Sequence, residues 1–125
     1  MAVIPFADSP RNGAWGDRPY AIIDWAGPAS YTAVTNGTAP AQPTGGQTIT
    51  NTAFGLSAGL EGIVQVGGST SGTYLVHAFQ ASAYNQGFGN PNWILRWTVA
   101  STGAEVAATT NLSGETVRLL AFGPY

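Results

Sequence analysis

The sequence predicts an all-β domain with an extended N-terminal arm: a compact, jelly-roll-like β-sandwich or a small barrel of about eight short strands. Three observations support this. Apolar and β-branched residues alternate over short runs, glycine- and proline-rich turns separate the runs, and no stretch repeats apolar residues at helical spacing. With 125 residues, the chain is expected to fold around one core.

The expected strands follow these alternating runs. They are Tyr20–Trp25, Tyr31–Thr35, Gln47–Thr50, Glu61–Val66, Thr73–Phe79, Trp93–Val99, Glu105–Ala108 and Thr116–Phe122. Turn-forming pairs stand between them, among them Asn36-Gly37, Asn90-Pro91 and Ser113-Gly114. The best helical candidate, Ala53–Leu60, contains two glycines and is too short.

The alternation is clearest in Trp93–Val99. Trp93 and Trp97 share one face of this strand, while Arg96 belongs to the other face. Thr116–Phe122 differs because it is apolar on both faces. Such a strand is either central in a sheet or covered by a partner subunit.

Residues 1–18 lack a strand pattern and are expected to lie outside the sheets. They combine several prolines and glycines with the apolar residues Ile4, Phe6 and Trp15. We expect an extended arm that docks on a partner through these side chains, in front of a sandwich domain that comprises residues 19–125.

Two further places are expected to make contacts. Residues 80–92 form a long polar loop that carries Tyr84 and Phe88, and loops of this length often have a binding role. Tyr125 follows closely after the last expected strand, so it is expected near the folded body.

The composition is weakly charged. Charged residues make up 8% of the chain, against about 25% in an ordinary soluble domain, and none is a lysine. The four arginines are scattered, which disfavours nucleic acid binding, and no stretch reaches the about 20 apolar residues of a membrane span. The N-terminus also lacks the basic start of a secretory signal. A weakly charged surface suits a protein held among neighbours in an assembly, since interface cores are depleted in charge.

No catalytic arrangement is recognisable, and we expect no enzyme activity. His77, the one histidine, falls inside an expected strand, where a hydrogen-bonded sheet residue is commoner than a catalytic base. The carboxylates available for a glycosidase pair are Asp17, Asp24, Glu61, Glu105 and Glu115. Glu105 and Glu115 lie beside turns, where solvated carboxylates are common, and Asp24 could equally cap a turn. With no cysteine and one histidine, we expect neither a metal site nor a cofactor.

One stretch resembles a known group of proteins. The segment WTVASTGAEVAATTNLSGETVRLLAF, from Trp97 to Phe122, resembles small structural proteins of tailed bacteriophages, in particular the head decoration or cement proteins. This resemblance implies a virion structural protein, made in the host cytoplasm, that binds the exterior of the capsid lattice and stabilises it. It assigns no catalytic or ligand-binding residue.

The expected partners are therefore the major capsid protein and further copies of this chain, in a homodimer or homotrimer. The residues expected to contact partners are Ile4, Phe6, Arg11, Trp15, Arg18, Tyr84, Phe88 and Tyr125. One alternative stays open: a carbohydrate-binding β-sandwich module, or a receptor-binding piece of a phage tail, in which Trp15, Tyr84 and Phe88 would stack on sugar rings.

Overall fold

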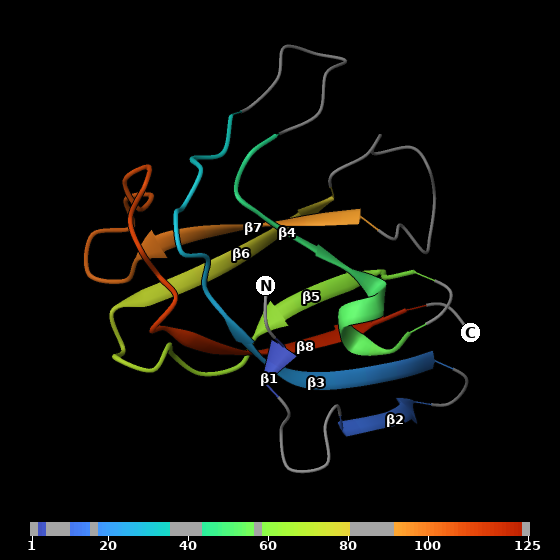
Figure 1. Ribbon diagram of the computed structural model, residues 1–125. Coiled ribbons are helices and arrows are strands. Elements are labelled where there is room, and N and C mark those ends of the chain that lie inside the picture. The colour runs from blue at the N-terminus through green and yellow to red at the C-terminus, as the bar shows by residue number, and fades with distance from the viewer. Residues whose placement is uncertain are drawn as a thin grey trace.

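The chain folds into two antiparallel sheets, shown in Figure 1. The computed structural model describes residues 3–4, 11–15, 18–35, 44–56, 59–80 and 92–123, with the backbone alone for residues 3–4, 11–15 and 18. The strands are β1 (Val3–Ile4), β2 (Arg11–Trp15), β3 (Arg18–Ala26), β4 (Gln47–Thr50), β5 (Gly62–Gln65), β6 (Tyr74–Gln80), β7 (Asn92–Val99) and β8 (Thr116–Phe122). This architecture confirms the prediction of an all-β fold.

The larger sheet has five strands in the order β1-β3-β8-β5, and β2 also pairs with β3. β1 and β2 lie along the same edge of β3, because β8 takes its other edge. Ile4 stands opposite Asp24, and Trp15 stands opposite Arg18. β3, at nine residues, is long enough for both partners.

This pairing corrects the expectation that residues 1–18 lie outside the sheets. Val3–Ile4 and Arg11–Trp15 are strands of the five-stranded sheet. Their sequence shows no clear alternation. The free edge of β3 supplies the backbone partners, and such an edge can recruit a segment whose own strand pattern is weak.

The smaller sheet has the order β4-β7-β6 and packs against the larger one, with a single hydrophobic core between them. β7 contributes Trp93, Leu95 and Trp97 to this core, as the alternation predicted. Ile23 of β3 and Leu119 of β8 meet them from the larger sheet, and both are fully buried. The two sheets form a sandwich with open edges.

Two expected strands are wrong. Tyr31–Thr35 and Glu105–Ala108 contribute only the isolated bridges Thr35–Thr44 and Thr98–Glu105. The backbone of Tyr31 instead bonds to the loop at 109–110, with N–O distances of 2.9 and 2.7 Å. These segments have β-type side chains, but their backbone partners lie in other loops, so no ladder extends along them.

A buried amide links the two sheets. Gln47 is 5% exposed; its Nε2 donates to the carbonyl of Ala26 at the end of β3 (2.9 Å), and its Oε1 accepts from the indole Nε1 of Trp97 (2.8 Å). Both ends of the amide are therefore satisfied inside the core, as a buried polar group requires.

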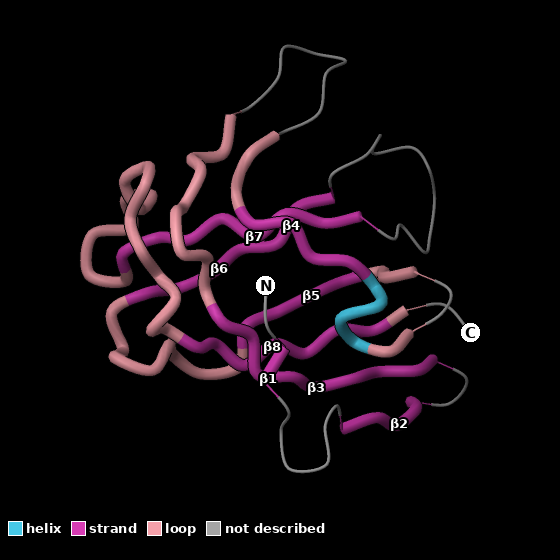
Figure 2. Tube along the Cα trace, in the orientation of Figure 1, coloured by secondary structure: helices cyan, strands magenta, loops and turns pink. Residues whose placement is uncertain are grey.

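Helical structure is minimal in the described part of the chain, as Figure 2 shows. One 3₁₀ turn, Asn51–Phe54, follows β4 and buries Phe54. It ends at Gly55, whose φ of 71° lies in the left-handed region that glycine adopts without strain. Within the described ranges, no helix has the length and apolar character of a membrane span.

The sheets meet along one side of the molecule, where β5 and β6 are neighbours (Figures 1 and 2). These strands follow one another in the chain but end different sheets, so they share no ladder. A side chain bridges them instead: the backbone N–H of Val76 donates to Oε1 of Gln65 at 2.7 Å.

Candidate interaction surface

The outer face of the five-stranded sheet is apolar at its centre. Along β3 and β8, alternate residues such as Ile23 and Leu119 are fully buried in the core. The residues between them point outward and are half-buried. Four of these, Tyr20, Ile22, Leu120 and Phe122, form what we call the outer-face patch.

The strand register brings the outer-face patch together. Tyr20 stands directly opposite Phe122, and Ile22 directly opposite Leu120. Such cross-strand neighbours on one face lie within about 5.5 Å of each other at Cβ. An antiparallel sheet with one face in water normally carries polar residues there. This face departs from that pattern, so it is suited to contact with another surface.

A glycine shapes the β5 side of the patch. A Cβ on Gly62 would lie 2.7 Å from Cζ of Phe122, so the absence of a side chain leaves room for the phenyl ring over β5. Gly62 and Phe122 are register partners. A side chain at position 62 would therefore displace the phenyl ring from β5.

An ion pair borders the patch at the other end of the same strands. Arg118 donates through Nε to Oδ1 of Asp24 at 2.8 Å and through Nη2 to Oδ2 at 3.3 Å. The two residues are register partners on β8 and β3. The hydrogen bond to Asp24 raises the pKa of Arg118. Asp24 thus neutralises a charge beside the patch and does not cap a turn.

The structure brings four of the predicted contact residues to this sheet. By register, Ile4 is opposite Asp24 and Arg11 is opposite Ile22, both outer-face positions of β3; Trp15 is opposite Arg18, the first residue of β3. The positions predicted from the sequence therefore flank the outer-face patch along the β3 edge. The other predicted contact residues, Phe6, Tyr84, Phe88 and Tyr125, lie outside the described residues.

Sequence reasoning did not single out the patch residues themselves. The signal was present in Thr116–Phe122, whose two apolar faces predicted either a central strand or a covered one. The structure confirms that β8 is central in its sheet, and its outer residues Leu120 and Phe122 are half-buried. Their partners Tyr20 and Ile22 follow only from the register.

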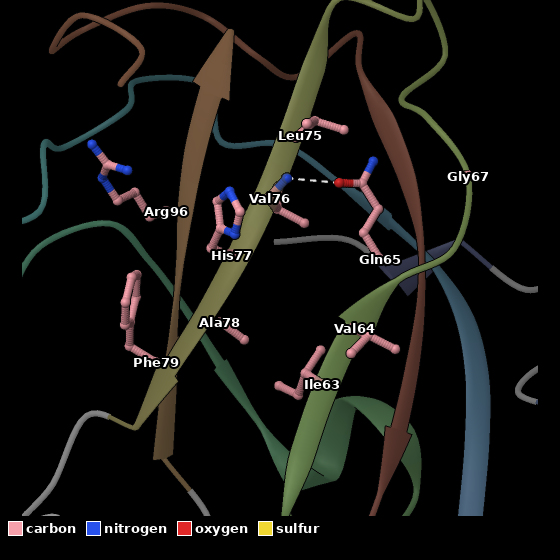
Figure 3. Close-up of a pocket in the computed structure, with 10 residues that line it drawn as sticks. All are labelled: Ile63, Val64, Gln65, Gly67, Leu75, Val76, His77, Ala78, Phe79 and Arg96. Atoms are coloured by element: carbon pink, nitrogen blue, oxygen red, sulfur yellow. Dashed lines mark hydrogen bonds between the residues drawn. The ribbon is translucent and has the colours of Figure 1, made fainter. Parts of the chain in front are cut away.

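A second feature is a groove of about 640 Å³ between β5 and β6, shown in Figure 3. The core-side residues Ile63, Val76 and Ala78 are among its lining residues. The large hydrophobic residues with substantial exposure in the described chain are Val64 (50%), Val66 (45%), Leu75 (39%) and Phe79 (38%). All four belong to the two chain segments that border this groove.

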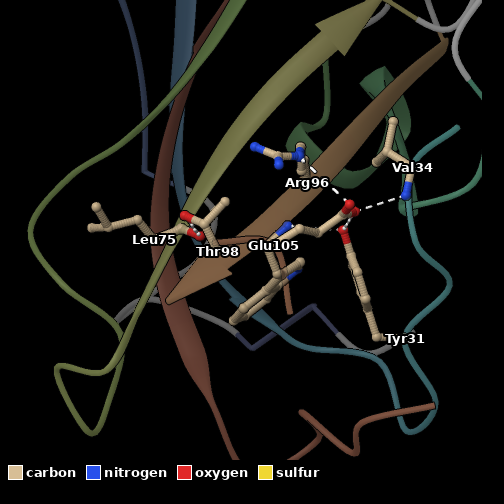
Figure 4. A network of polar contacts seen from close by, with 7 residues as sticks. Tyr31, Val34, Leu75, Arg96, Thr98 and Glu105 are labelled. Atoms are coloured by element: carbon tan, nitrogen blue, oxygen red, sulfur yellow. Dashed lines mark hydrogen bonds and ion pairs between the residues drawn. The ribbon is translucent and has the colours of Figure 1, made fainter. Parts of the chain in front are cut away.

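A network of polar contacts centres on Glu105 and reaches Arg96 of β7 (Figure 4). Oε2 of Glu105 accepts hydrogen bonds from the Tyr31 hydroxyl and the Val34 N–H, each at 2.7 Å. Oε1 of Glu105 lies 3.8 Å from Nε of Arg96. Burial, with the hydrogen bond to Glu105 second, raises the pKa of Tyr31 to about 12.

Glu105 and Glu115, two of the carboxylates considered for a glycosidase pair, have structural partners. Glu105 is engaged in that network, which differs from the solvated carboxylate expected beside a turn. Glu115 accepts from the N–H and the hydroxyl of Ser71, at 3.2 and 2.9 Å, and so holds the loop before β6. His77 is exposed on β6, opposite Arg96. Within the described ranges, no cluster of three or more His, Asp or Glu side chains could hold a metal ion.

Comparisons with protein-family models, curated proteins and solved structures found no match.

Proposed function

We propose that this protein is a virion structural protein that binds the outside of a bacteriophage capsid lattice and stabilises the shell, as a cement or decoration protein. The observation that carries the proposal is the apolar outer-face patch. It offers other subunits an apolar sheet surface made of Tyr20, Ile22, Leu120 and Phe122.

The low charge of the chain favours burying its surface against other subunits. Only 8% of the chain is charged, and Arg118 beside the patch is paired with Asp24. Burying such a surface therefore leaves few charges to desolvate, and interface cores are depleted in charged residues.

Stabilisation of a shell follows from mass action. A protein that binds the assembled lattice and not the separate capsid subunits shifts the equilibrium toward the lattice. Many copies on one particle add their contributions, so each contact can be modest. Self-association into a dimer or trimer would raise the effective concentration of neighbouring patches.

The test is binding to preassembled, undecorated capsids of tailed phages, measured by co-sedimentation. Deleting residues 2–18 would remove two strands of the sheet, so point substitutions are the cleaner probe. We expect the double variant Ile22→Thr/Leu120→Thr to lose at least about tenfold in affinity. Thr keeps the strand propensity of these positions.

Leu75→Thr is the matched control, because Leu75 is an exposed leucine on the other sheet. We expect it to bind capsids as the unaltered protein does. Failure of the unaltered protein to bind any undecorated capsid, together with clear binding of the isolated domain on a glycan array, would replace this proposal with the carbohydrate-binding alternative.

A further inference from the structure

We propose that the groove between β5 and β6 binds an extended, acidic segment of a partner polypeptide, which adds as a strand to the free edge of β6. This inference goes beyond capsid binding and does not depend on it, since the groove and the outer-face patch are different surfaces. Val64 of β5 lies between the two.

The free edge of β6 has donors that its own sheet does not use. β7 pairs with one edge of β6, so alternate residues of β6 direct their N–H and C=O groups away from β7. Tyr74 and Val76 belong to this set, because their N–H groups donate to side chains, Ser69 Oγ at 3.1 Å and Gln65 Oε1 at 2.7 Å. By the same alternation, the N–H of Ala78 faces the groove.

Gln65 closes one end of the groove, as Figure 3 shows. Its side-chain oxygen stands where the carbonyl of a neighbouring strand would stand in a continuous sheet. The Nε2 of the same amide is buried and has no hydrogen-bond partner among the described residues. A buried donor without a partner is costly, so the amide of Gln65 holds this position at an energetic cost.

The walls of the groove favour apolar side chains. Leu75 and Phe79 stand on β6, with Val64 across on β5, and each is at least 38% exposed. Edge strands in native proteins are usually protected by charged residues, prolines or covering segments. An added strand would cover these apolar side chains and pair the open edge in one step, which is the β-addition mode of peptide recognition.

The positive charge of Arg96 in the groove favours an acidic segment over a neutral or basic one. Arg96 is the one formally charged residue among the groove's lining residues, and His77 stands opposite it on β6. The contact that the structure gives Arg96 in the described chain is a long ion pair through Nε, 3.8 Å from Glu105. Because 3.8 Å is too long for a hydrogen bond, the guanidinium of Arg96 can still pair with a carboxylate in the groove.

The test uses heptapeptides in which Val and Thr alternate, capped at both ends, with Glu, Gln or Lys in the centre. The whole protein is titrated with each, and binding is followed through the backbone amide NMR signals. We expect the signals of Gln65, Val76 and Ala78 to shift and the affinity to fall in the order Glu, Gln, Lys. Glu should exceed Gln by about threefold, the usual effect of a partly exposed ion pair.

Backbone pairing is tested in the peptide itself. N-methylation at alternate residues removes the donors that face β6, and we expect about a tenfold loss of affinity. Methylation shifted by one residue removes donors that face away from β6, and the affinity should stay within about twofold. Equal losses from both patterns would overturn strand addition.

Variants of the protein complete the test. Phe79→Thr should weaken every peptide by about fivefold, and Arg96→Gln should abolish the preference for Glu over Gln while leaving the Gln peptide unchanged. Ile22→Thr, in the outer-face patch, is the matched control and should bind as the unaltered protein does. The inference fails if no heptapeptide binds at about millimolar concentration, or if the shifted amides lie outside the groove.

Discussion

The hydroxyl of Tyr31 donates a 2.7 Å hydrogen bond to Oε2 of Glu105, 74 positions further along the chain. The hydroxyl oxygen of Tyr31 in turn accepts a hydrogen bond of 3.1 Å from the backbone N–H of Trp97 in β7. β4 stops pairing with β7 at Leu95, so Tyr31 supplies the acceptor that a longer β4 would have supplied. The Tyr31 hydroxyl thus takes the place of a β4 carbonyl as the partner of this β7 N–H.

This contact makes stability depend on pH at the alkaline end. The pKa of Tyr31 is raised from 10.0 to about 12 in the folded protein, so between these values the unfolded chain loses a proton that the folded chain keeps. Stability is therefore full below pH 10 and falls as the pH rises toward 12. The expected loss is about 2 to 3 kcal/mol, measured by urea unfolding at a series of pH values.

Tyr31→Phe separates this residue from the other tyrosines. At neutral pH, we expect the variant to be less stable by about 1 to 3 kcal/mol, because the N–H of Trp97 and one oxygen of Glu105 lose a partner. Its stability should then fall less steeply above pH 10. An unchanged alkaline slope in Tyr31→Phe would contradict the assignment.

Gln47 is predicted to hold the two sheets together through hydrogen bonds and not through its volume. Gln47→Met keeps the size but leaves the buried indole N–H of Trp97 and the carbonyl of Ala26 without this partner. We expect a loss of about 1 to 3 kcal/mol in the free energy of unfolding. Thr48→Ala, an exposed position in the same strand, should change it by no more than about 0.5 kcal/mol.

Gly27 is predicted to tolerate no side chain. A Cβ there would lie 2.4 Å from the carbonyl oxygen and 2.6 Å from the Cβ of Leu112, which is itself buried. Gly27→Ala should therefore cost about 1 to 3 kcal/mol in thermal unfolding. Gly114→Ala, where nothing lies within 4 Å of the added carbon, is the control. Equal melting temperatures for the two variants would refute the close approach.

The two faces of β8 are predicted to respond differently to the same change. Leu119 is fully buried, so Leu119→Thr should cost about 2 to 5 kcal/mol in urea unfolding. Leu120 is half-buried on the outer face, so Leu120→Thr should cost about 1 kcal/mol but weaken binding to undecorated capsids in co-sedimentation. Undiminished capsid binding in Leu120→Thr would show that Leu120 is not part of the capsid contact.

Much of the strand pattern could be read from local sequence. Gln47–Thr50 and Thr116–Phe122 have the predicted bounds, and β7 differs from its prediction by one residue. These runs combine alternation with flanking turn residues, so local propensity and burial point to the same structure. Tyr31–Thr35 failed because its side chains resemble a strand while its backbone pairs with a loop.

The candidate surfaces were harder to predict than the strands. Trp15 and Arg18 drew notice as isolated interface residue types, and the structure sets their positions opposite each other on β2 and β3. The outer-face patch needs Ile22 and Leu120 side by side, although almost a hundred positions separate them. Glu105 was expected to be solvated because its hydrogen-bond donors, Tyr31 and Val34, lie 74 and 71 positions away in the chain, and its counter-ion Arg96 lies on β7.

The sequence by itself determined the all-β class, the position of most strands and the scarcity of charge, because each depends on residues close together in the chain. Only the tertiary structure decided which outer residues become neighbours, that β5 and β6 face each other across a groove, and that Tyr31 reaches Glu105. Those relations depend on strand order and register. Both are set by the summed packing of distant segments, which no local pattern encodes.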